Sequence, residues 1–114
     1  MEVTQIGHVH VYVSDRPKAV DWLKTVWGTD PIAEDHEMSL FVFGSTQLVV
    51  NDVDEDILST IAFISDDCER DYREAIAKGA VAVHEPQDKP WGVKAAFLEG
   101  PGKLIFEIEE TLPR

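Results

Sequence analysis

The stretch IGHVHVYVSD, residues 6–15, places His8 and His10 two positions apart in a run that otherwise has the composition of a buried strand. Side chains two positions apart point to the same face of a β-strand, so His8, His10 and Tyr12 share one face. The valines between them form the other face and are expected to lie under a helix. Imidazole groups can bind a metal, transfer protons or line a pocket through hydrogen bonds, and the spacing leaves all three roles open.

A carboxylate interrupts a second strand pattern near the end of the chain. In KLIFEIEE, apolar residues such as Phe106 alternate with Lys103, Ile105 and Glu107. An unpaired carboxylate under a helix is costly. Glu107 is therefore expected to face away from the apolar set, and an ordinary surface glutamate is the simpler interpretation.

Composition limits the classes of function. The chain has 114 residues and a formal net charge of -12, which repels phosphate backbones and predicts no nucleic-acid partner. The acidity favours a cationic ligand, although solubility alone also explains it. A single cysteine, Cys68, predicts no intrachain disulfide. Without a long apolar run or a basic-then-apolar leader, we expect no membrane span and a cytoplasmic location.

The first half has the pattern of a strand, a helix and three short strands. Asp15 is expected to cap the helix, with Pro17 in its first turn and Gly28 just beyond its end. The apolar residues of this helix, including Trp22 and Trp27, recur at helical spacing and predict core positions. Short strands are expected at 31–34, 39–43 and 46–51, the last two joined by a turn at 44–45.

The second half repeats this plan. STIAFIS predicts a strand, Asp66 or Asp67 a helix cap, and Gly79 the helix end, followed by strands near 81–84, 93–98 and 104–109. Asp15 aligns with Asp67 at an offset of 52, so the sequence predicts two βαβββ modules, about 1–53 and 57–112, within one domain of residues 1–114. The acidic run NDVDEDILS between them is expected to be a solvated connector.

This order of elements resembles the vicinal oxygen chelate superfamily, which includes glyoxalase I, extradiol dioxygenases and bleomycin resistance proteins. The resemblance rests on IGHVHVYVSDRPKAVDWLKTVWG, STIAFISDDCERDYREAIAKG and PWGVKAAFLEGPGKLIFEIEE, which cover nearly the whole chain. It implies an α+β fold in which tandem βαβββ modules form a cup-shaped mixed sheet. It also implies a homodimer. The fold hosts lyases, isomerases, dioxygenases and binding proteins, so the resemblance says less about function.

The resemblance further implies metal ligands on the first and last strand of each module. His8 occupies one such position, and Glu107 a second when the strand is aligned from Pro101; aligned from Gly102, Phe106 takes that place. Thr60 stands where the metal enzymes have histidine, and a hydroxyl is a poor ligand for a transition metal.

The remaining ligand position falls in STQLVVND, which offers Gln47, Val49 and Asn51 on one face. Neither His36 nor His84 has support from the resemblance. We therefore favour a hollow without a metal or other cofactor, and keep a divalent metal held by His8 and Glu107 as the alternative.

Aromatic residues add candidates for ligand contact. Trp91, in the proline-containing stretch EPQDKPWG, is the best candidate for stacking on a ligand, and Phe41 is either core or pocket wall. The predicted ligand-binding set is His8, His10, Tyr12, Phe41, Gln47, Val49, Thr60, Trp91 and Glu107.

These patterns favour a small-molecule-binding protein that sequesters a toxic or antibiotic-like, cationic compound. One alternative is a metal-dependent lyase, isomerase or dioxygenase that uses His8 and Glu107. Another is a non-catalytic interaction module.

Overall fold

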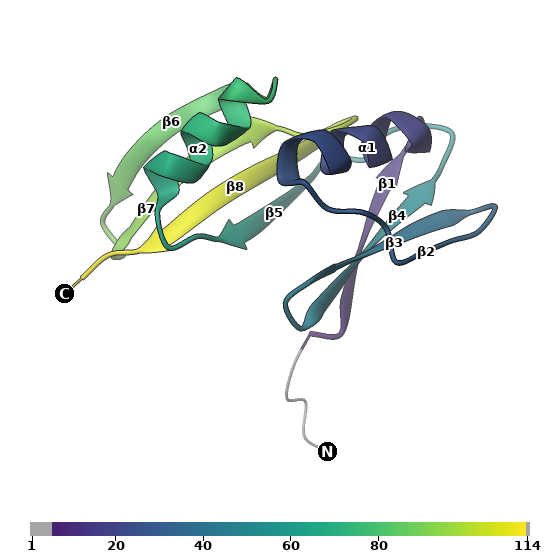
Figure 1. Cartoon of the computed structure of the whole chain (residues 1–114), viewed down its shortest axis with the longest axis horizontal. Helices are drawn as coiled ribbons and strands as arrows, with labels where there is room; N and C mark the ends of the chain where they lie inside the picture. The colour runs from purple at the N-terminus through teal and green to yellow at the C-terminus, as the bar shows by residue number, and fades with distance from the viewer. Residues whose placement is uncertain (1–5, 114) are drawn as a thin grey trace, which may run out of the picture. The chain divides into compact units, whose positions relative to one another are not determined.

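Two copies of a β-α-β-β-β unit follow each other along the chain in the computed structural model, which describes residues 6–113 (Figure 1). The first unit ends at Ile57 and the second begins at Leu58. The elements of the first unit are β1 (His8–Val13), α1 (Arg16–Trp22), the π-helical segment η1 (Leu23–Trp27), β2 (Ala33–Glu34), β3 (Met38–Phe43) and β4 (Thr46–Asp52). Those of the second are β5 (Ser59–Ile64), α2 (Cys68–Ala77), β6 (Val81–Lys89), β7 (Val93–Glu99) and β8 (Leu104–Thr111).

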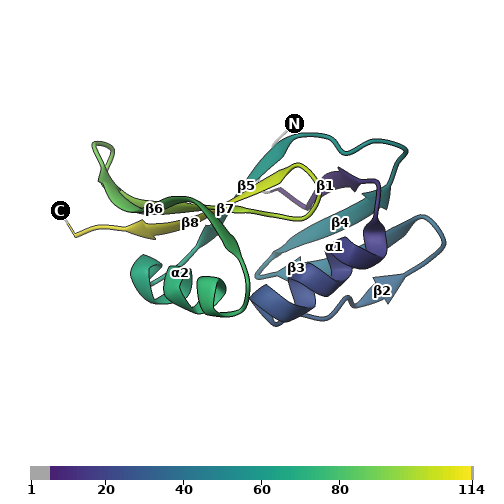
Figure 2. The same cartoon turned by 90° about the horizontal axis from the view of Figure 1, so that it is seen from above.

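Each unit contains one four-stranded mixed sheet. The strand orders are β1-β4-β3-β2 and β5-β8-β7-β6, with β1 parallel to β4 and β5 parallel to β8. A parallel pair needs a crossover connection, and a helix lies on one face of its own sheet in each unit (Figure 2). The α+β fold of tandem βαβββ modules that the sequence predicts is confirmed.

Aspartate caps begin both helices as predicted. The Asp15 carboxylate accepts a hydrogen bond from the Lys18 backbone N–H at 3.1 Å. In the second unit Asp67, rather than Asp66, is the cap, and it accepts from the Arg70 backbone N–H at 3.1 Å. Both carboxylates accept hydrogen bonds from backbone N–H groups of the first helical turn, which have no partner within the helix.

The first helix departs from prediction at its end. A single α-helix was expected as far as residue 27, but its last turn is a π-helix that stops at Gly28, whose φ is 69°. Trp22 and Trp27 pack edge to face there, with ring centroids 5.4 Å apart. The wider π turn brings residues five apart onto one side, which the α-helical spacing does not do.

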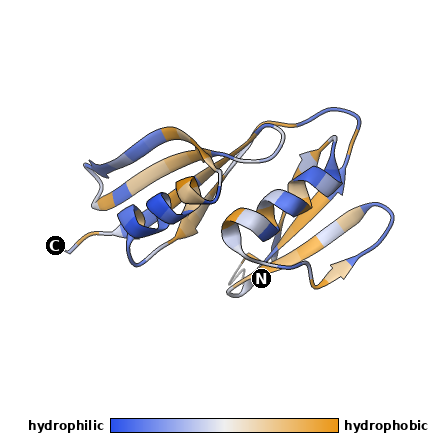
Figure 3. Ribbon diagram, turned by 45° about the horizontal axis from the view of Figure 1, so that its top comes forward, coloured by the Kyte–Doolittle hydropathy of each residue, from blue (hydrophilic) through white to orange (hydrophobic). Residues whose placement is uncertain are grey.

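Apolar residues form a core between each helix and its sheet, and Figure 3 shows them concentrated in the strands. In the first unit Val11, Phe41 and Val50 are fully buried. In the second, Phe106 and Leu98 have no exposed surface. The helix-facing side of each sheet is thus mainly apolar, and the opposite side carries the candidate site residues His8, His10 and Glu107.

The strand β6 is longer than the sequence predicts. It continues to Lys89, through Pro86, where a loop was expected. The register against β7 shifts between Ala82 and His84 and again before Gln87. A proline is tolerated in an edge strand with such bulges because its missing N–H is not needed by a neighbour.

The acidic connector is held by specific bonds as well as being solvated. Asp56 accepts hydrogen bonds from the backbone N–H and the hydroxyl of Ser14, at 2.8 and 3.1 Å. The Ile57 N–H donates to the Tyr12 carbonyl at 3.2 Å. Its interpretation as a solvated connector is therefore incomplete. No helix within residues 6–113 is long and apolar enough to cross a membrane.

Candidate functional site

The face of the first sheet that α1 leaves uncovered carries the two histidines. Val11 and Val13 are buried under the helix, as predicted, while His8 and His10 are exposed and Tyr12 is half-buried. The His8 and His10 rings meet edge to face with centroids 5.0 Å apart, and the His10 and Tyr12 rings lie nearly parallel at 6.3 Å. The strand alternation has therefore gathered three rings in a row.

Strand β4 supplies the neighbouring row of this face. Its parallel register sets Gln47 beside His8, Val49 beside His10 and Asn51 beside Tyr12. The Nδ1 atom of His10 lies 2.9 Å from the Oδ1 atom of Asn51. The sequence placed Asn51 on this face but did not connect it to His10, because the offset between two parallel strands is not encoded in either strand alone.

Strand β3 completes what we call the histidine face. The residues that β1, β4 and β3 place there are His8, His10 and Tyr12; Gln47, Val49 and Asn51; and Met38, Leu40 and Val42. None of these is Asp, Glu, Lys or Arg. The face is thus an uncharged, largely apolar surface edged by imidazole, phenol and amide groups, which suits a flat organic molecule better than a small ion.

The second unit has an equivalent surface, the glutamate face, with Thr60, Ala62 and Ile64 on β5 beside Ile105, Glu107 and Glu109 on β8. Glu107 pairs with Phe97 of β7. As predicted, its side chain lies on the face of the sheet opposite to that of the buried Phe106. The alternative alignment, which directs Glu107 into the core, is wrong. His84 lies across Phe97 from Glu107, two strand spacings or roughly 10 Å away.

The carboxyl group of Glu107 is electrostatically unusual. Burial is the main cause that raises its pKa, from 4.5 to about 7, and a hydrogen bond and like charge from Glu109 add to it. Lys89 acts in the opposite direction. Near neutral pH this carboxyl therefore exists in both protonation states, which is a property of general acids and bases.

The residues do not fit the metal site that the resemblance implies. Comparison of the two parallel registers makes Thr60 the equivalent of His8, and Val49 the equivalent of Glu107. The first unit thus offers the good metal ligand His8 but has Val49, whose isopropyl group cannot bind a metal, at the second position. The second unit offers Glu107 with the poor ligand Thr60. Among the described residues, no three His, Cys, Asp or Glu side chains gather as a metal site. His36, 87% exposed beside Glu37, does not complete a set.

Two predicted ligand-binding residues lie elsewhere. Phe41 pairs with Leu48 on the helix-facing side of its sheet and has no exposed surface, so it belongs to the core and not to the histidine face. Trp91 is 70% exposed in the turn between β6 and β7, next to the end of β8. Thr60 pairs with Ile105 near the start of β8, whereas Trp91 lies near Thr111 at its end. The two residues are therefore about 20 Å apart along this strand.

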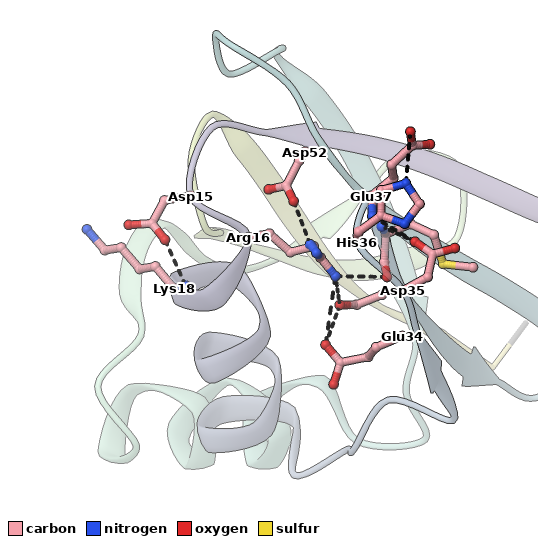
Figure 4. A network of polar contacts seen from close by, with 10 residues as sticks. Asp15, Arg16, Lys18, Glu34, Asp35, His36, Glu37 and Asp52 are labelled. Carbon is pink, nitrogen blue, oxygen red and sulfur yellow. Dashed lines mark hydrogen bonds and ion pairs between the residues drawn. The ribbon is translucent and has the colours of Figure 1, made fainter.

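A half-buried arginine network, which the sequence did not reveal, holds the first unit together (Figure 4). The Arg16 guanidinium donates to Asp52 at 2.7 Å, to the Met38 carbonyl at 2.8 Å and to the Ser39 hydroxyl at 3.0 Å. That hydroxyl donates in turn to Glu34 at 2.7 Å. The network lies on the helix side and joins α1 to all three later strands, so it fixes the strands that carry the histidine face.

Comparison with known proteins gives a likeness of fold. No family model and no curated protein sequence matches the chain. A glyoxalase/bleomycin resistance protein/dioxygenase from Nocardioides is similar over 98% of this chain and 86% of its own, with a TM-score of 0.83 and 17% identity. A bleomycin resistance determinant encoded on the transposon Tn5 is similar over 95% and 98%, with a TM-score of 0.81 and 15% identity.

TioX from Micromonospora sp. ML1 is similar over 96% of this chain and all of its own, with a TM-score of 0.78 and 21% identity. At these identities the likeness establishes the fold. The fold that the resemblance to the vicinal oxygen chelate superfamily implied is confirmed.

Proposed function

We propose that this chain binds a flat, cationic, antibiotic-like molecule on the histidine face and sequesters it without a metal. The observation that carries the proposal is the row of three rings, His8, His10 and Tyr12, on an uncharged sheet surface. Planar rings offer apolar area and stacking to a flat ligand. A cation over the Tyr12 ring gains further electrostatic attraction.

The charge of the first unit supports a cationic ligand. Residues 1–57 contain 11 acidic and three basic residues, a net charge of -8. Such a field raises the local concentration of cations and the rate at which they arrive, even though the face itself is neutral. The fold likeness to a bleomycin resistance determinant is consistent with this class of ligand.

A thermal-shift screen against cationic aromatic antibiotics, including bleomycin, tests the proposal. A compound present at 100 times its Kd stabilises the chain by about 2.7 kcal/mol, and we expect a rise in Tm of roughly 10 °C. Tyr12→Ala should abolish the rise, whereas Tyr72→Ala, a tyrosine of α2 in the second unit, should keep it. An unchanged rise in Tyr12→Ala would refute binding at this face.

A second candidate function, proton transfer by Glu107, has one observation in its favour. Its pKa of about 7 suits a general base at neutral pH. A carbonyl probe such as the hemithioacetal of methylglyoxal and glutathione tests it, by deuterium uptake from solvent. Uptake that Glu107→Gln abolishes and Glu99→Gln retains would favour this candidate over sequestration.

A further inference from the structure

The hydrogen bond between His10 and Asn51 determines which ring nitrogen carries the proton. The two atoms are the Nδ1 atom of His10 and the amide oxygen of Asn51, 2.9 Å apart. An amide oxygen only accepts hydrogen bonds, so the proton lies on Nδ1. In a neutral imidazole the other nitrogen, Nε2, then has a free lone pair and acts as an acceptor.

The surroundings hold this ring in one orientation. Asn51 pairs with Tyr12 across the parallel strands, which sets its amide diagonally opposite His10. The Tyr12 ring lies 17° from parallel to the His10 ring, and the His8 ring meets it at 75°. Although His10 is exposed, its hydrogen bond to Asn51 and the two flanking rings restrict the imidazole before any ligand arrives, which reduces the entropy lost on binding.

We propose that Asn51 is the positioning residue that fixes His10 as a hydrogen-bond acceptor, so that the histidine face selects aromatic ligands that carry an O–H or N–H donor. This inference rests on the proposed function of the face. The strands place no carboxylate there to accept such a donor. The Gln47 amide, the Tyr12 hydroxyl and the His8 ring each offer a donor as well as an acceptor, so they do not discriminate. His10 differs because its donor is occupied by Asn51, which leaves Nε2 as the selective acceptor.

Nitrogen-15 NMR of the imidazole rings in the full chain tests the tautomer directly, at pH 8.5, about two units above the ordinary imidazole pKa. We expect the His10 signal of a ring protonated at Nδ1. In Asn51→Leu the proton should move to Nε2, while Asn51→Asp, which keeps an accepting oxygen, should retain the native pattern. The His36 signals serve as the control and should not change.

A matched pair of probes tests the selectivity. The compounds 2-naphthol and 2-methoxynaphthalene share one ring system, but methylation removes the donor of the second. We expect 2-naphthol to bind the native chain roughly tenfold more tightly, and the ratio to fall to about one in Asn51→Leu, in which no amide oxygen holds the His10 proton on Nδ1.

The outcomes separate the inference from the function it rests on. Equal Kd values for the two probes, or a native His10 protonated at Nε2, would overturn the role of Asn51 while leaving the face a binding surface. Failure of both neutral probes to bind, while the cationic antibiotic from the thermal-shift screen still binds, would overturn the donor selectivity alone. Failure of the probes and of every screened cation would overturn binding at the face itself.

Discussion

Replacing Glu107 by glutamine should stabilise the chain at alkaline pH and leave its stability unchanged in acid. The pKa of Glu107 is raised from 4.5 to about 7, because burial and Glu109 disfavour the charged form. The folded state therefore holds a proton that the unfolded chain releases, and stability falls as pH rises from about 4.5 to about 7. The loss in free energy of unfolding caused by ionising Glu107 is fully present above about pH 7 and absent below about pH 4.5.

The magnitude follows from the two pKa values. At about 1.36 kcal/mol per pKa unit, a rise from 4.5 to about 7 corresponds to roughly 3 kcal/mol. Water screens the exposed part of the carboxyl group, so we expect Glu107→Gln to add about 1–2 kcal/mol to the free energy of unfolding at pH 8.

Urea denaturation of the native chain and the variant at pH 8 and pH 4 measures this difference. Glu99→Gln, an exposed glutamate of β7, is the matched control and should change the free energy of unfolding by less than about 0.5 kcal/mol at either pH. An equal gain for Glu107→Gln at both pH values, or no gain at pH 8, would refute the assignment of a half-buried carboxyl with a raised pKa.

Four further predictions follow from the same structure. Arg16→Met should lower the free energy of unfolding by about 2 kcal/mol because the part-buried Met38 carbonyl and Ser39 hydroxyl lose their donor, whereas Arg73→Met, which removes an exposed ion pair, should cost less than about 0.5 kcal/mol in urea denaturation. Glu109→Gln should lower the pKa of Glu107, measured by carbon-13 NMR titration of its carboxyl; an unchanged pKa would assign the effect to burial alone. Elemental analysis of untagged protein should find far less than one Zn, Ni, Mn or Fe per chain, and a stoichiometric metal would contradict the donor set described here. Sedimentation equilibrium should give twice the chain mass of 12.8 kDa, and a mass of 12.8 kDa would contradict the predicted homodimer.

Local patterns in the sequence were sufficient for the order of elements and for which residues share a face. The aspartate at each helix start and the alternation in VHVYV act over a few residues, so they are visible without a structure. The same alternation placed Glu107 correctly, away from Phe106.

Features that depend on contacts between distant segments were not predictable in the same way. Arg16 bonds to Asp52 and Ser39, which lie 36 and 23 residues away, and nothing in the local pattern around Arg16 indicates either partner. The bond between His10 and Asn51 depends in the same way on the offset between β1 and β4.

Two errors came from reading local composition as local structure. EPQDKP has the composition of a loop, but its position at the edge of a sheet lets it extend β6. Phe41 shares a strand with residues of both faces, and only the pairing with Leu48 assigns it to the core.

The most direct test of the account is an NMR map of the aromatic side chains, recorded while the screened antibiotic that stabilises the chain most is titrated in. We predict that the largest chemical-shift changes occur at the rings of His8, His10 and Tyr12. Changes confined to other rings, such as Trp91, with these three signals unmoved at saturation would contradict the assignment of the histidine face as the binding surface.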